Sequence, residues 1–389
     1  MNKQTVRDID LQGKTVLVRV DFNVPLQEGK IMDDTRIVKT LPTINYLLDN
    51  HCKVILLSHL GRPDGNVNDK LRLAPIADHL AKLLKKPVIK LNDCVGEEVE
   101  TKVRQAKPGE IILLENVRFH SAEEKNDLAF AKELALLGDV YVNDAFGAAH
   151  RAHASTEGIT KYLPAVAGLL LTKEIETLEK IMTDPERPLV GIIGGAKIST
   201  KMGVIAKLLP KVDCLLLGGA LANTILKAKG VQVGASLVED EMLSEASKLP
   251  IDKKELEIPV DVVVAKDPQK PEDSQIKATG KIDSDDRILD IGPDTIKLFS
   301  DIISKAKMVI WNGPLGMFEI PKFAEGTKEI AKVIGESGVK AIVGGGETVD
   351  AIKELGLADK IWHISTGGGA MLEFLEGKEL PGIKALKNK

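Results

Sequence analysis

The stretch that decides the fold is Pro188-Leu-Val-Gly-Ile-Ile193 together with the GGAKISTK that follows it, Gly194 to Lys201. The six apolar residues predict a buried strand, and the two glycines after it let the backbone approach an anion closely. Lys197 and Lys201 are four residues apart, so we expect them to share one face of a helix. The stretch fits a phosphate site. It fits equally well an ordinary turn from strand to helix with two solvated lysines, because short motifs often match by chance.

Length and composition narrow the class of protein. With 389 residues, the chain exceeds the size at which one hydrophobic core usually stops growing, so we expect two domains. A net charge of -4 and an aromatic content of 3% argue against a nucleic-acid binder, which would need a basic surface or a platform for base stacking. The N-terminus lacks the apolar core of a signal peptide, and no apolar run is long enough to span a bilayer. We expect a cytoplasmic protein without a membrane partner.

The cysteines fit the same setting. Cys52, Cys94 and Cys214 are far apart, form no CxxC pair and are odd in number. This pattern is typical of reduced thiols and predicts neither a disulfide framework nor a zinc site.

One pattern recurs along the whole chain. Short runs rich in Val, Ile and Leu alternate with longer amphipathic stretches, which predicts an α/β protein with parallel sheets and more strands than one small sheet needs. The runs that predict strands are Thr15 to Val20, Val54 to Leu57, Ile111 to Leu114, Val140 to Val142, Leu189 to Ile193, Cys214 to Leu217, Val260 to Val264, Ile288 to Ile291, Met308 to Trp311, Ala341 to Val343 and Ile361 to Ile364.

The residues after these runs differ between the two halves. In the first half the runs end in VDFN, SHLGRP, ENVRF and NDAFGAAHR, whose side chains are charged or form hydrogen bonds. In the second half they end in GGAKISTK, GGALANT, IGPDT, WNGPLGMFE, GGGET and STGGGA, which are rich in glycine. Ligands of α/β sheets bind at the carboxyl ends of the strands, so we expect two different ligands. The change falls at LPAVAGLLLTKEIETLEKIM, whose helical periodicity predicts a long linking helix.

The arginines support an anionic ligand in the first half. All but Arg187 and Arg287 lie at or before Arg151, and several follow the predicted strands. A guanidinium group matches carboxylate and phosphate oxygens, although a single arginine is more often part of a surface ion pair. Asp21 and Asn23 follow the first predicted strand. They would either contact the ligand or only form the turn at that point. Arg36 precedes a helical pattern in which Asp33 or Asp34 is the expected N-cap.

The second half lacks the usual nucleotide motifs. It contains neither GxxxxGK[ST] nor GxGxxG, so a nucleotide would have to bind glycine-rich strand ends, Lys197 and Lys201. Glu319 or Glu347 would supply an acid for a metal ion or a ribose. Gly367 to Gly369 precede another helical pattern, so their backbone N–H groups would face an anion.

Nine motifs in order along nearly the whole chain resemble the phosphoglycerate kinase family. They are VRVDFNVP, SHLGRP, LLENVRF, VNDAFGAAHRAHAS, GGAKISTK, IGPDT, WNGPLGMFE, GGGET and STGGGA. The resemblance implies reversible phosphate transfer between ATP and 3-phosphoglycerate, giving ADP and 1,3-bisphosphoglycerate. It also implies two Rossmann-like three-layer αβα domains with parallel sheets. The phosphoglycerate domain would comprise residues 1–169 and 372–389, and the nucleotide domain residues 170–371, with the linking helix at about 170–183.

The resemblance also implies the site residues. The phosphoglycerate site would consist of Asp21, Asn23, Arg36, His59, Leu60, Gly61, Arg62, Arg118 and Arg151. The nucleotide site would consist of Lys197, Lys201, Gly219, Gly292, Asn312, Glu319, Gly345, Gly346, Glu347 and Thr348. Residues acting on the transferring group would be Arg36, Lys197, Lys201, Gly367 and Gly368.

One position departs from the family. Where the family commonly has aspartate in GGGD[ST], as a ligand of the nucleotide-bound Mg²⁺, this chain has Glu347. The carboxylate is kept on a side chain one methylene longer, so it would ligate the ion directly in an adjusted geometry or through water.

The implied reaction needs no general base, because its nucleophile is a carboxylate that is already ionised at neutral pH. Catalysis then consists of alignment and charge neutralisation, and we expect the two domains to close and exclude water. We expect a monomer. The alternatives are a two-domain binder of anionic metabolites, which would consume no ATP, and a nicotinamide dehydrogenase, whose fingerprint is absent.

Overall fold

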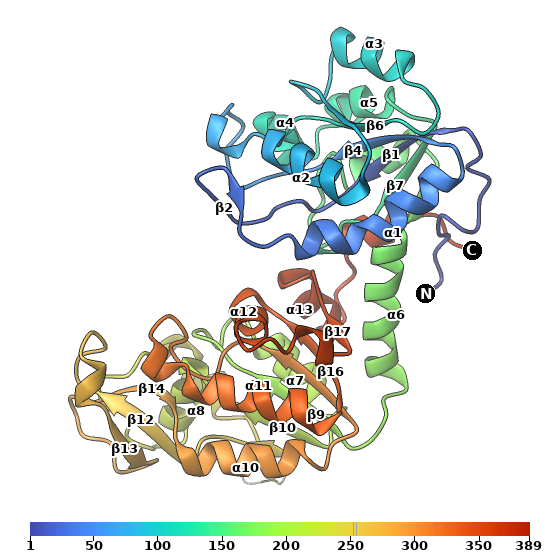
Figure 1. Ribbon diagram of the computed structural model, residues 1–389. Helices are drawn as coiled ribbons and strands as arrows, with labels where there is room; N and C mark the ends of the chain where they lie inside the picture. Colours follow the sequence, from blue (N-terminus) through green and yellow to red (C-terminus); the bar gives the residue numbers. More distant parts are fainter. Residues whose placement is uncertain (252, 254) are drawn as a thin grey trace. The chain divides into compact units, whose positions relative to one another are not determined.

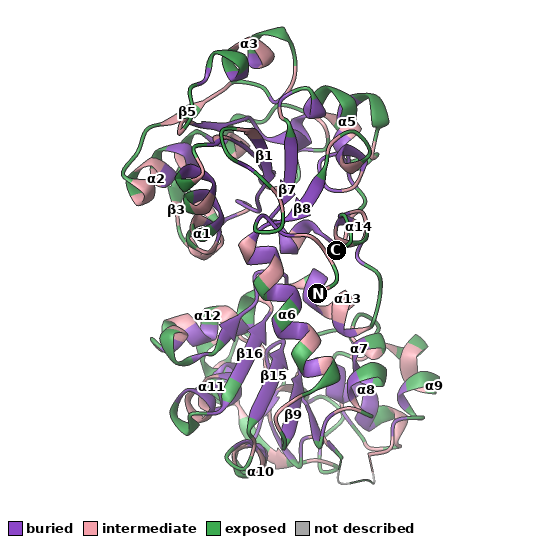
Figure 2. Cartoon of the chain, turned by 90° about the vertical axis from the view of Figure 1, so that its right-hand side faces the viewer, coloured by how far each residue is buried: buried purple, intermediate pink, exposed green. Residues whose placement is uncertain are grey.

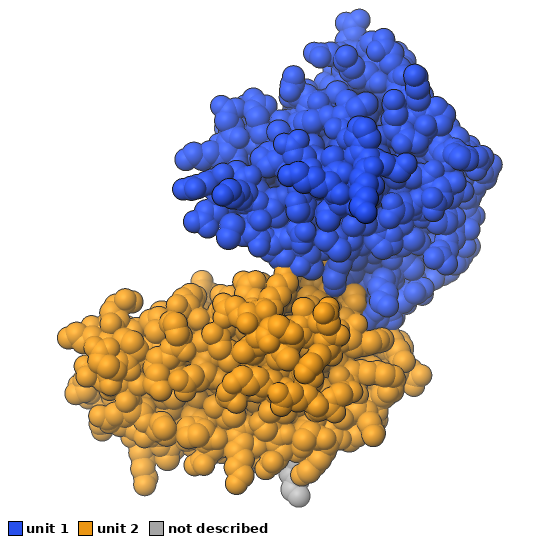
Figure 3. Space-filling model, viewed as in Figure 1, with its two compact units in different colours: residues 1–179, 379–389 blue, residues 180–378 orange. Residues whose placement is uncertain are grey.

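The computed structural model describes residues 1–251, 253 and 255–389, which form two compact units (Figure 1). Unit 1 comprises Met1–Glu179 and Glu379–Lys389, and unit 2 comprises Lys180–Lys378 (Figure 3). The division at residue 179 falls inside helix α6, Leu169–Thr183, where the sequence predicts a linking helix. The functional domain boundaries at 169/170 and 371/372 stay predictions.

Unit 1 is built on a parallel sheet. In spatial order its strands are β5 (Val88–Lys90), β6 (Ile111–Leu113), β4 (Lys53–Leu57), β1 (Thr15–Arg19), β7 (Val140–Asn143) and β8 (Ala165–Ala167). Its helices are α1 (Thr35–Asp49), α2 (Ala74–Leu84), α3 (Glu97–Gln105), α4 (Ser121–Glu124), α5 (Leu128–Ala135) and α14 (Pro381–Lys384). Short 3-10 turns are η1 (Asp69–Leu71), η2 (Val117–Phe119), η3 (Phe146–Ala148) and η4 (Gly158–Lys161), and β2 (Leu26–Gln27) pairs with β3 (Lys30–Ile31).

Both faces of the unit 1 sheet are buried. Val16 and Val18 of β1 belong to one core with Ile44 and Leu47 of α1, while the intervening Leu17 is equally buried on the opposite face. A strand buried on both sides needs an unbroken apolar run, which is why these strands were visible in the sequence.

Helix α1 has one of the two expected aspartates, Asp34, as its N-cap. Asp34 occupies the N-cap position but makes no capping bond, because its Oδ2 lies 2.8 Å from His79 Nε2. Asp33 takes over locally, and its Oδ1 accepts a hydrogen bond of 3.0 Å from the backbone N–H of Thr35. Arg36 is thereby held in the first turn of the helix.

Unit 2 repeats the architecture. Its parallel strands, in spatial order, are β11 (Leu256–Glu257), β10 (Cys214–Leu217), β9 (Leu189–Ile193), β15 (Met308–Asn312), β16 (Lys340–Gly344) and β17 (His363–Ile364). Its helices are α7 (Met202–Leu208), α8 (Ala220–Ala228), α9 (Leu243–Ala246), α10 (Pro293–Ile303), α11 (Glu325–Ser337), α12 (Gly346–Glu354) and α13 (Gly369–Leu375). Its 3-10 turns are η5 (Asp240–Met242), η6 (Pro271–Asp273), η7 (Pro321–Phe323) and η8 (Ala358–Lys360). Strands β9, β15 and β16 are buried, whereas the helices around them keep exposed outer faces (Figure 2).

Two runs that the sequence assigned to parallel sheets belong elsewhere. Strands β12 (Asp261–Ala265) and β14 (Arg287–Ile291) pair antiparallel, and β13 (Gln275–Ala278) completes a separate sheet in the order β13-β12-β14. The connection from β12 to β13 contains only the short turn η6, and a parallel pairing needs a longer crossover. The two-domain α/β prediction is otherwise confirmed.

The C-terminal segment returns to unit 1, as the family resemblance implies. Lys3 forms a β-bridge with Asn388, and Asn143 Nδ2 donates a hydrogen bond of 2.9 Å to the carbonyl of Gly382. All three cysteines are free and buried. Within the described residues, no helix has the length and apolar character needed to cross a membrane.

Candidate active site

In unit 1 the predicted polar residues lie at the carboxyl ends of the central strands. The strand order reverses beside β1, with β4 on one side and β7 on the other, and such a reversal is where α/β sheets bind ligands. The loops after β1, β4, β6 and β7 meet there and carry Asp21, His59, Arg118 and Arg151.

Asp21, Asn23, Arg36 and Gly61 are directly connected. Asn23 Oδ1 accepts a hydrogen bond of 2.9 Å from the N–H of Gly61, which joins the loop after β1 to the loop after β4. Arg36 Nη1 donates to the carbonyl of Asn23 at 2.8 Å and lies 3.4 Å from Asp21 Oδ2. These contacts orient the guanidinium group of Arg36 at the edge of the sheet. They leave several of its N–H donors available to a ligand.

His59 is buried and held neutral. Burial, followed by the positive charges of Arg19, Arg118 and Arg36, holds the pKa of His59 well below its usual range. Arg19 Nη2 lies 3.1 Å from His59 Nδ1 and can only donate, so the ring proton belongs on Nε2. A neutral imidazole with an N–H donor suits an anionic ligand.

Arg118 is fixed by the same loop. Its Nη1 donates to the carbonyl of Gly61 at 2.9 Å, and its Nε lies 3.1 Å from Glu124 Oε1. Burial, only partly offset by Glu124, lowers its pKa, although a guanidinium group stays charged at any relevant pH. Leu60, next to His59, is buried and is held by Asn116, whose Nδ2 donates to the Leu60 carbonyl at 2.8 Å.

Arg62 and Arg151 are the more accessible cations of the predicted set. Arg62 is exposed at the end of the SHLGR loop. Arg151 is half-buried, and its Nε donates to His150 Nε2 at 3.2 Å. Both side chains are at least partly accessible to a ligand.

The sequence did not assign a buried network beneath this site. Arg19 Nε donates to Ser155 Oγ at 2.8 Å, and Ser155 Oγ donates to Glu123 Oε1 at 2.6 Å. Burial raises the pKa of Glu123, while Arg19 and Ser155 lower it. An arginine inside the apolar strand VLVRV was the one available signal, whereas Ser155 and Glu123 lie too far away in the sequence to be connected with it.

In unit 2 the strand order reverses between β9 and β15, and there Lys201 Nζ donates a hydrogen bond to Asn312 Oδ1. The predicted shared helical face of Lys197 and Lys201 is wrong, because α7 begins only at Met202 and residues 199–201 form a turn. Lys197 is exposed. Glu239 holds this loop through hydrogen bonds from the N–H of Ser199 at 2.9 Å and from its hydroxyl at 2.6 Å.

The polar groups around Lys201 are incompletely paired. Among the described residues, the buried Asn312 Nδ2 has no hydrogen-bond partner. Burial lowers the pKa of Lys201 to about 8, against the opposing effect of Glu347. Partial desolvation and then repulsion from Glu319 raise the pKa of Glu347, which Lys201 lowers. A lysine, an unused amide donor and two neighbouring carboxylates together fit a phosphate group with a divalent cation.

A cavity of about 420 Å³ lies in the same unit. The predicted residues Gly219, Glu319 and Glu347 line it, together with the apolar side chains of Leu237, Val262, Leu289, Leu315 and Met317. The apolar residues come from separate segments, so no motif in the sequence indicated them. Such a wall can hold a flat, largely apolar group between the predicted glycines and the antiparallel sheet.

Several glycines in or next to the predicted site are required by packing. A Cβ on Gly194 would lie 2.1 Å from the carbonyl oxygen of Pro314, and a Cβ on Gly292 would lie 2.3 Å from Asp261 Oδ2. Gly219 has φ +69° at the start of α8, a conformation that side chains rarely adopt. The side chain of Thr348 has a structural partner as well, since its Oγ1 accepts a hydrogen bond of 2.9 Å from the N–H of Gly313.

Other glycines begin helices with free space around them. Gly345 is the N-cap of α12, and Gly368 is the N-cap of α13 with φ +43°. Within the described part of the chain, no atom lies within 4 Å of a Cβ built on Gly346 or Gly368. The N–H of Gly367 donates to Ser365 Oγ at 3.1 Å. The helix starts at Gly346 and Gly368 therefore have room for a ligand.

Comparisons with known proteins agree with one another. The family model described as phosphoglycerate kinase matches residues 6–378. A phosphoglycerate kinase from Dictyoglomus turgidum is 56% identical, and one from Pelotomaculum thermopropionicum is 52% identical, each over 100% of both chains. The solved structure of phosphoglycerate kinase from Coxiella burnetii is 41% identical with a TM-score of 0.85, covering 98% of both chains. That from Pyrococcus horikoshii is 33% identical with a TM-score of 0.86, also covering 98% of both.

Proposed function

Because the chain belongs to the phosphoglycerate kinase family, we propose that its two clusters bind the two substrates of the glycolytic transfer between ATP and 3-phosphoglycerate. The proposal for the nucleotide rests on Asn312 Nδ2, which has no partner among the described residues, because a buried donor without a partner is costly unless a ligand accepts from it. The proposal for the phosphoglycerate rests on His59, which is neutral and lies among arginines.

The phosphoglycerate site is in unit 1. Arg62, Arg118, Arg151 and His59 Nε2 would donate to the phosphate group, which offers several acceptor oxygens. Arg36, anchored on Asp21 and Asn23, would orient the reacting carboxylate. The buried Arg19–Ser155–Glu123 network would keep His59 in the required tautomer.

The nucleotide site is in unit 2. The apolar cavity suits the base, and the glycine-rich loops, Asn312, Lys197 and Lys201 suit the phosphates. Glu347 fits as a carboxylate ligand for Mg²⁺, since partial burial and then the charge of the nearby Glu319 raise its pKa, and a bound cation would offset both effects. When bound, Mg²⁺ would neutralise charge on the phosphate oxygens.

The reaction then proceeds without proton transfer. A carboxylate oxygen of 3-phosphoglycerate attacks the γ-phosphorus of ATP in line, the bond to the β-phosphate oxygen breaks, and ADP leaves with that electron pair. Lys201, Arg36 and the backbone N–H group of Gly368 would stabilise the charge that spreads over the transferring oxygens, and the N–H of Gly367 would join them by exchanging its bond to Ser365 Oγ. Since each substrate is bound by a different unit, we propose that the units approach each other during the cycle and exclude water.

A coupled assay tests the function directly. With ATP, Mg²⁺ and 3-phosphoglycerate, the purified protein should form ADP and an acyl phosphate that a dehydrogenase and NADH report. ATP consumption that does not depend on 3-phosphoglycerate would contradict the proposal. We further propose a cytoplasmic monomer, in keeping with three free, buried thiols, and light scattering of the purified protein would test its mass.

Replacing Arg62 by alanine should weaken phosphoglycerate binding selectively. Removing one charge-assisted hydrogen bond costs about 1.5–3 kcal/mol, so the KM for 3-phosphoglycerate should rise roughly 10- to 100-fold. The KM for ATP should change little. Steady-state kinetics with each substrate varied would measure both values. Arg104→Ala, an exposed arginine of α3 paired with Glu100, is the matched control, and a larger effect on ATP would contradict the assignment.

The pH dependence should report Lys201. Its pKa is lowered to about 8, so below this pH the ammonium group is present, and above it the charge needed by the phosphates is lost. The value of kcat/KM for ATP, which reports the free enzyme, should therefore fall as pH rises through about 8. Lys201→Arg, which stays protonated, should lose this alkaline limb. The same limb in both proteins would show that another group titrates.

Replacing Glu347 by glutamine should raise the Mg²⁺ requirement. The amide keeps the size of the side chain but lacks its negative charge, so half-saturation by Mg²⁺ should need about tenfold more metal. Titration of Mg²⁺ at fixed ATP, followed by activity and by nucleotide affinity, would measure this. Glu354→Gln at the other end of α12 serves as the control. An unchanged requirement would remove Glu347 from the metal site.

A further inference from the structure

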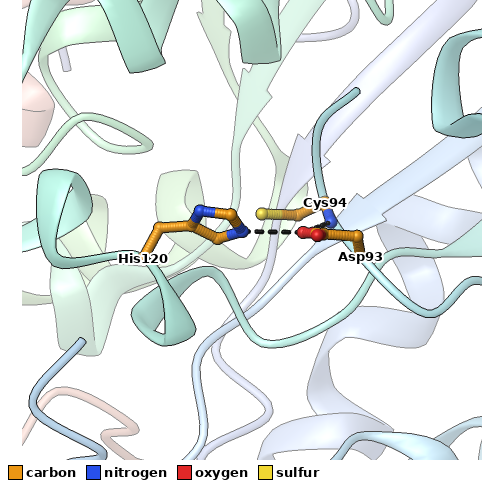
Figure 4. A group of neighbouring side chains, drawn as sticks. All are labelled: Asp93, Cys94 and His120. Carbon is orange, nitrogen blue, oxygen red and sulfur yellow. Dashed lines mark hydrogen bonds and ion pairs between the residues drawn. The ribbon is translucent and has the colours of Figure 1, made fainter. Parts of the chain in front are cut away.

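A second group of ligating side chains lies in unit 1, apart from the residues proposed for either substrate. Asp93 and Cys94 follow β5, and His120 follows η2 after the neighbouring strand β6. The two loops are held together by a hydrogen bond of 3.2 Å from the N–H of Glu115 to the carbonyl of Asp93. Figure 4 shows the His120 ring pointing at the Asp93 carboxylate, with the Cys94 sulfur beside them.

The three ligand atoms are already close together. One oxygen of Asp93, the sulfur of Cys94 and a ring nitrogen of His120 all lie within 4.8 Å of one another. His120 Nε2 and Asp93 Oδ1 are 2.7 Å apart. Bonds of about 2.3 Å to sulfur and about 2.0 Å to nitrogen and oxygen need ligand atoms somewhat more than 3 Å apart in a tetrahedron. The exposed Asp93 side chain can make this adjustment by a small rotation.

The surroundings hold the proposed ligands in place. Cys94 is fully buried, which fixes the position of its sulfur. A divalent cation bound here would replace the thiol proton and release it to solvent. His120 is also kept in place, because its ring stacks on Phe130 with centroids 5.1 Å apart.

We propose that Asp93, Cys94 and His120 bind a zinc ion, with water in the fourth position. One sulfur, one imidazole nitrogen and one carboxylate oxygen suit Zn²⁺, whereas Mg²⁺ prefers an all-oxygen shell. The site is therefore distinct in chemistry from the one proposed at Glu347. It is open on the side of Asp93 and His120, whose side chains reach solvent, and closed on the side of the buried Cys94.

The competing explanation is that these residues only tie two loops together. Asp93 Oδ1 also accepts a hydrogen bond of 2.7 Å from the N–H of Cys94, so the carboxylate has a structural role without any metal. The chain offers a matched control for this alternative. In unit 1, His79 Nε2 and Asp34 Oδ2 form a pair at 2.8 Å that is exposed to a similar extent, and no cysteine completes it as a cluster among the described residues.

Calorimetric titration of Zn²⁺ into the full-length protein, with tags removed, chelator-treated and kept reduced, tests the proposal. We expect one equivalent to bind with proton release and with little competition from millimolar Mg²⁺. Co²⁺ in its place should give thiolate-to-metal charge-transfer absorption. Cys94→Ser and His120→Asn should each weaken Zn²⁺ binding at least about 100-fold, since even loss of an outer partner costs 10- to 100-fold. His79→Asn should bind Zn²⁺ like the unmodified protein.

Two results would overturn the zinc site. One is the absence of stoichiometric binding and of the charge-transfer band, and the other is full affinity in His120→Asn. If Cys94→Ser fails to fold, His120→Asn decides, because its partly exposed side chain can be replaced without opening the core. Phosphotransfer by the unmodified protein is measured separately, so failure of either proposal leaves the other standing.

Discussion

Replacement of Lys201 by alanine is expected to lower kcat about 100-fold, with a smaller effect on the KM for either substrate. The ammonium group of Lys201 lies where the strand order reverses between β9 and β15, and it donates a hydrogen bond to Asn312. During the reaction it would stay with the phosphoryl group as negative charge moves onto the transferring oxygens. Removing a single hydrogen-bond donor that acts on the transition state typically lowers kcat by about 10²- to 10³-fold, and the prediction takes the lower value. Steady-state kinetics at saturating substrates would measure it.

The matched control is Lys207→Ala. Lys207 is an exposed residue of α7 that lies outside both proposed sites, so its removal should leave kcat unchanged. A rise in the KM for ATP without a fall in kcat would mean that Lys201 binds the nucleotide equally in the ground state and the transition state. The role on the transferring group would then be wrong.

Gly194→Ala is expected to give a larger loss of stability than replacement of the glycines in the predicted nucleotide site. The added methyl carbon would lie 2.1 Å from the carbonyl oxygen of Pro314 and 2.7 Å from that of Gly313, and both are backbone atoms. Neither can move aside without shifting the end of β15. Overpacking a well-packed region costs about 1–3 kcal/mol and occasionally more, and we expect the upper end of this range.

Urea denaturation followed by a probe in unit 2, such as the fluorescence of the buried Trp311, would measure the loss. Gly346→Ala is the control for stability, because the described residues leave open space around its added methyl group. Its midpoint should stay the same or rise, since alanine favours the helix that begins there. Equal midpoints for the two variants would show that the close approach at Gly194 is not a constraint.

Much of the fold was readable from the sequence because strands buried on both faces need continuous apolar runs. The run Leu189–Ile193 matches β9 at both ends, and the linking helix lies where its periodicity placed it. The antiparallel pairing of β12 and β14 was missed, since a short apolar run has the same appearance in either kind of sheet. The short strands β5, β8 and β11 were missed as well.

The candidate sites were predictable only in part. Residues at strand ends, such as Asp21, His59 and Lys201, could be proposed because a parallel sheet gathers those ends along one edge. The network beneath them could not, because Ser155 and Glu123 reach Arg19 from distant loops. The cluster of Asp93, Cys94 and His120 was hidden for the same reason, and the spacing of the cysteines had indicated no metal.

The stretch GGAKISTK shows which features the sequence determines and which depend on the tertiary structure. By itself the sequence determined a buried strand followed by flexible residues and two cations, because apolar content and glycine act locally. Only the tertiary structure decided that Gly194 is needed to approach β15, and that Lys201 but not Lys197 is drawn in to Asn312. Close packing and desolvation depend on which distant backbone lies opposite, and no local pattern specifies that neighbour.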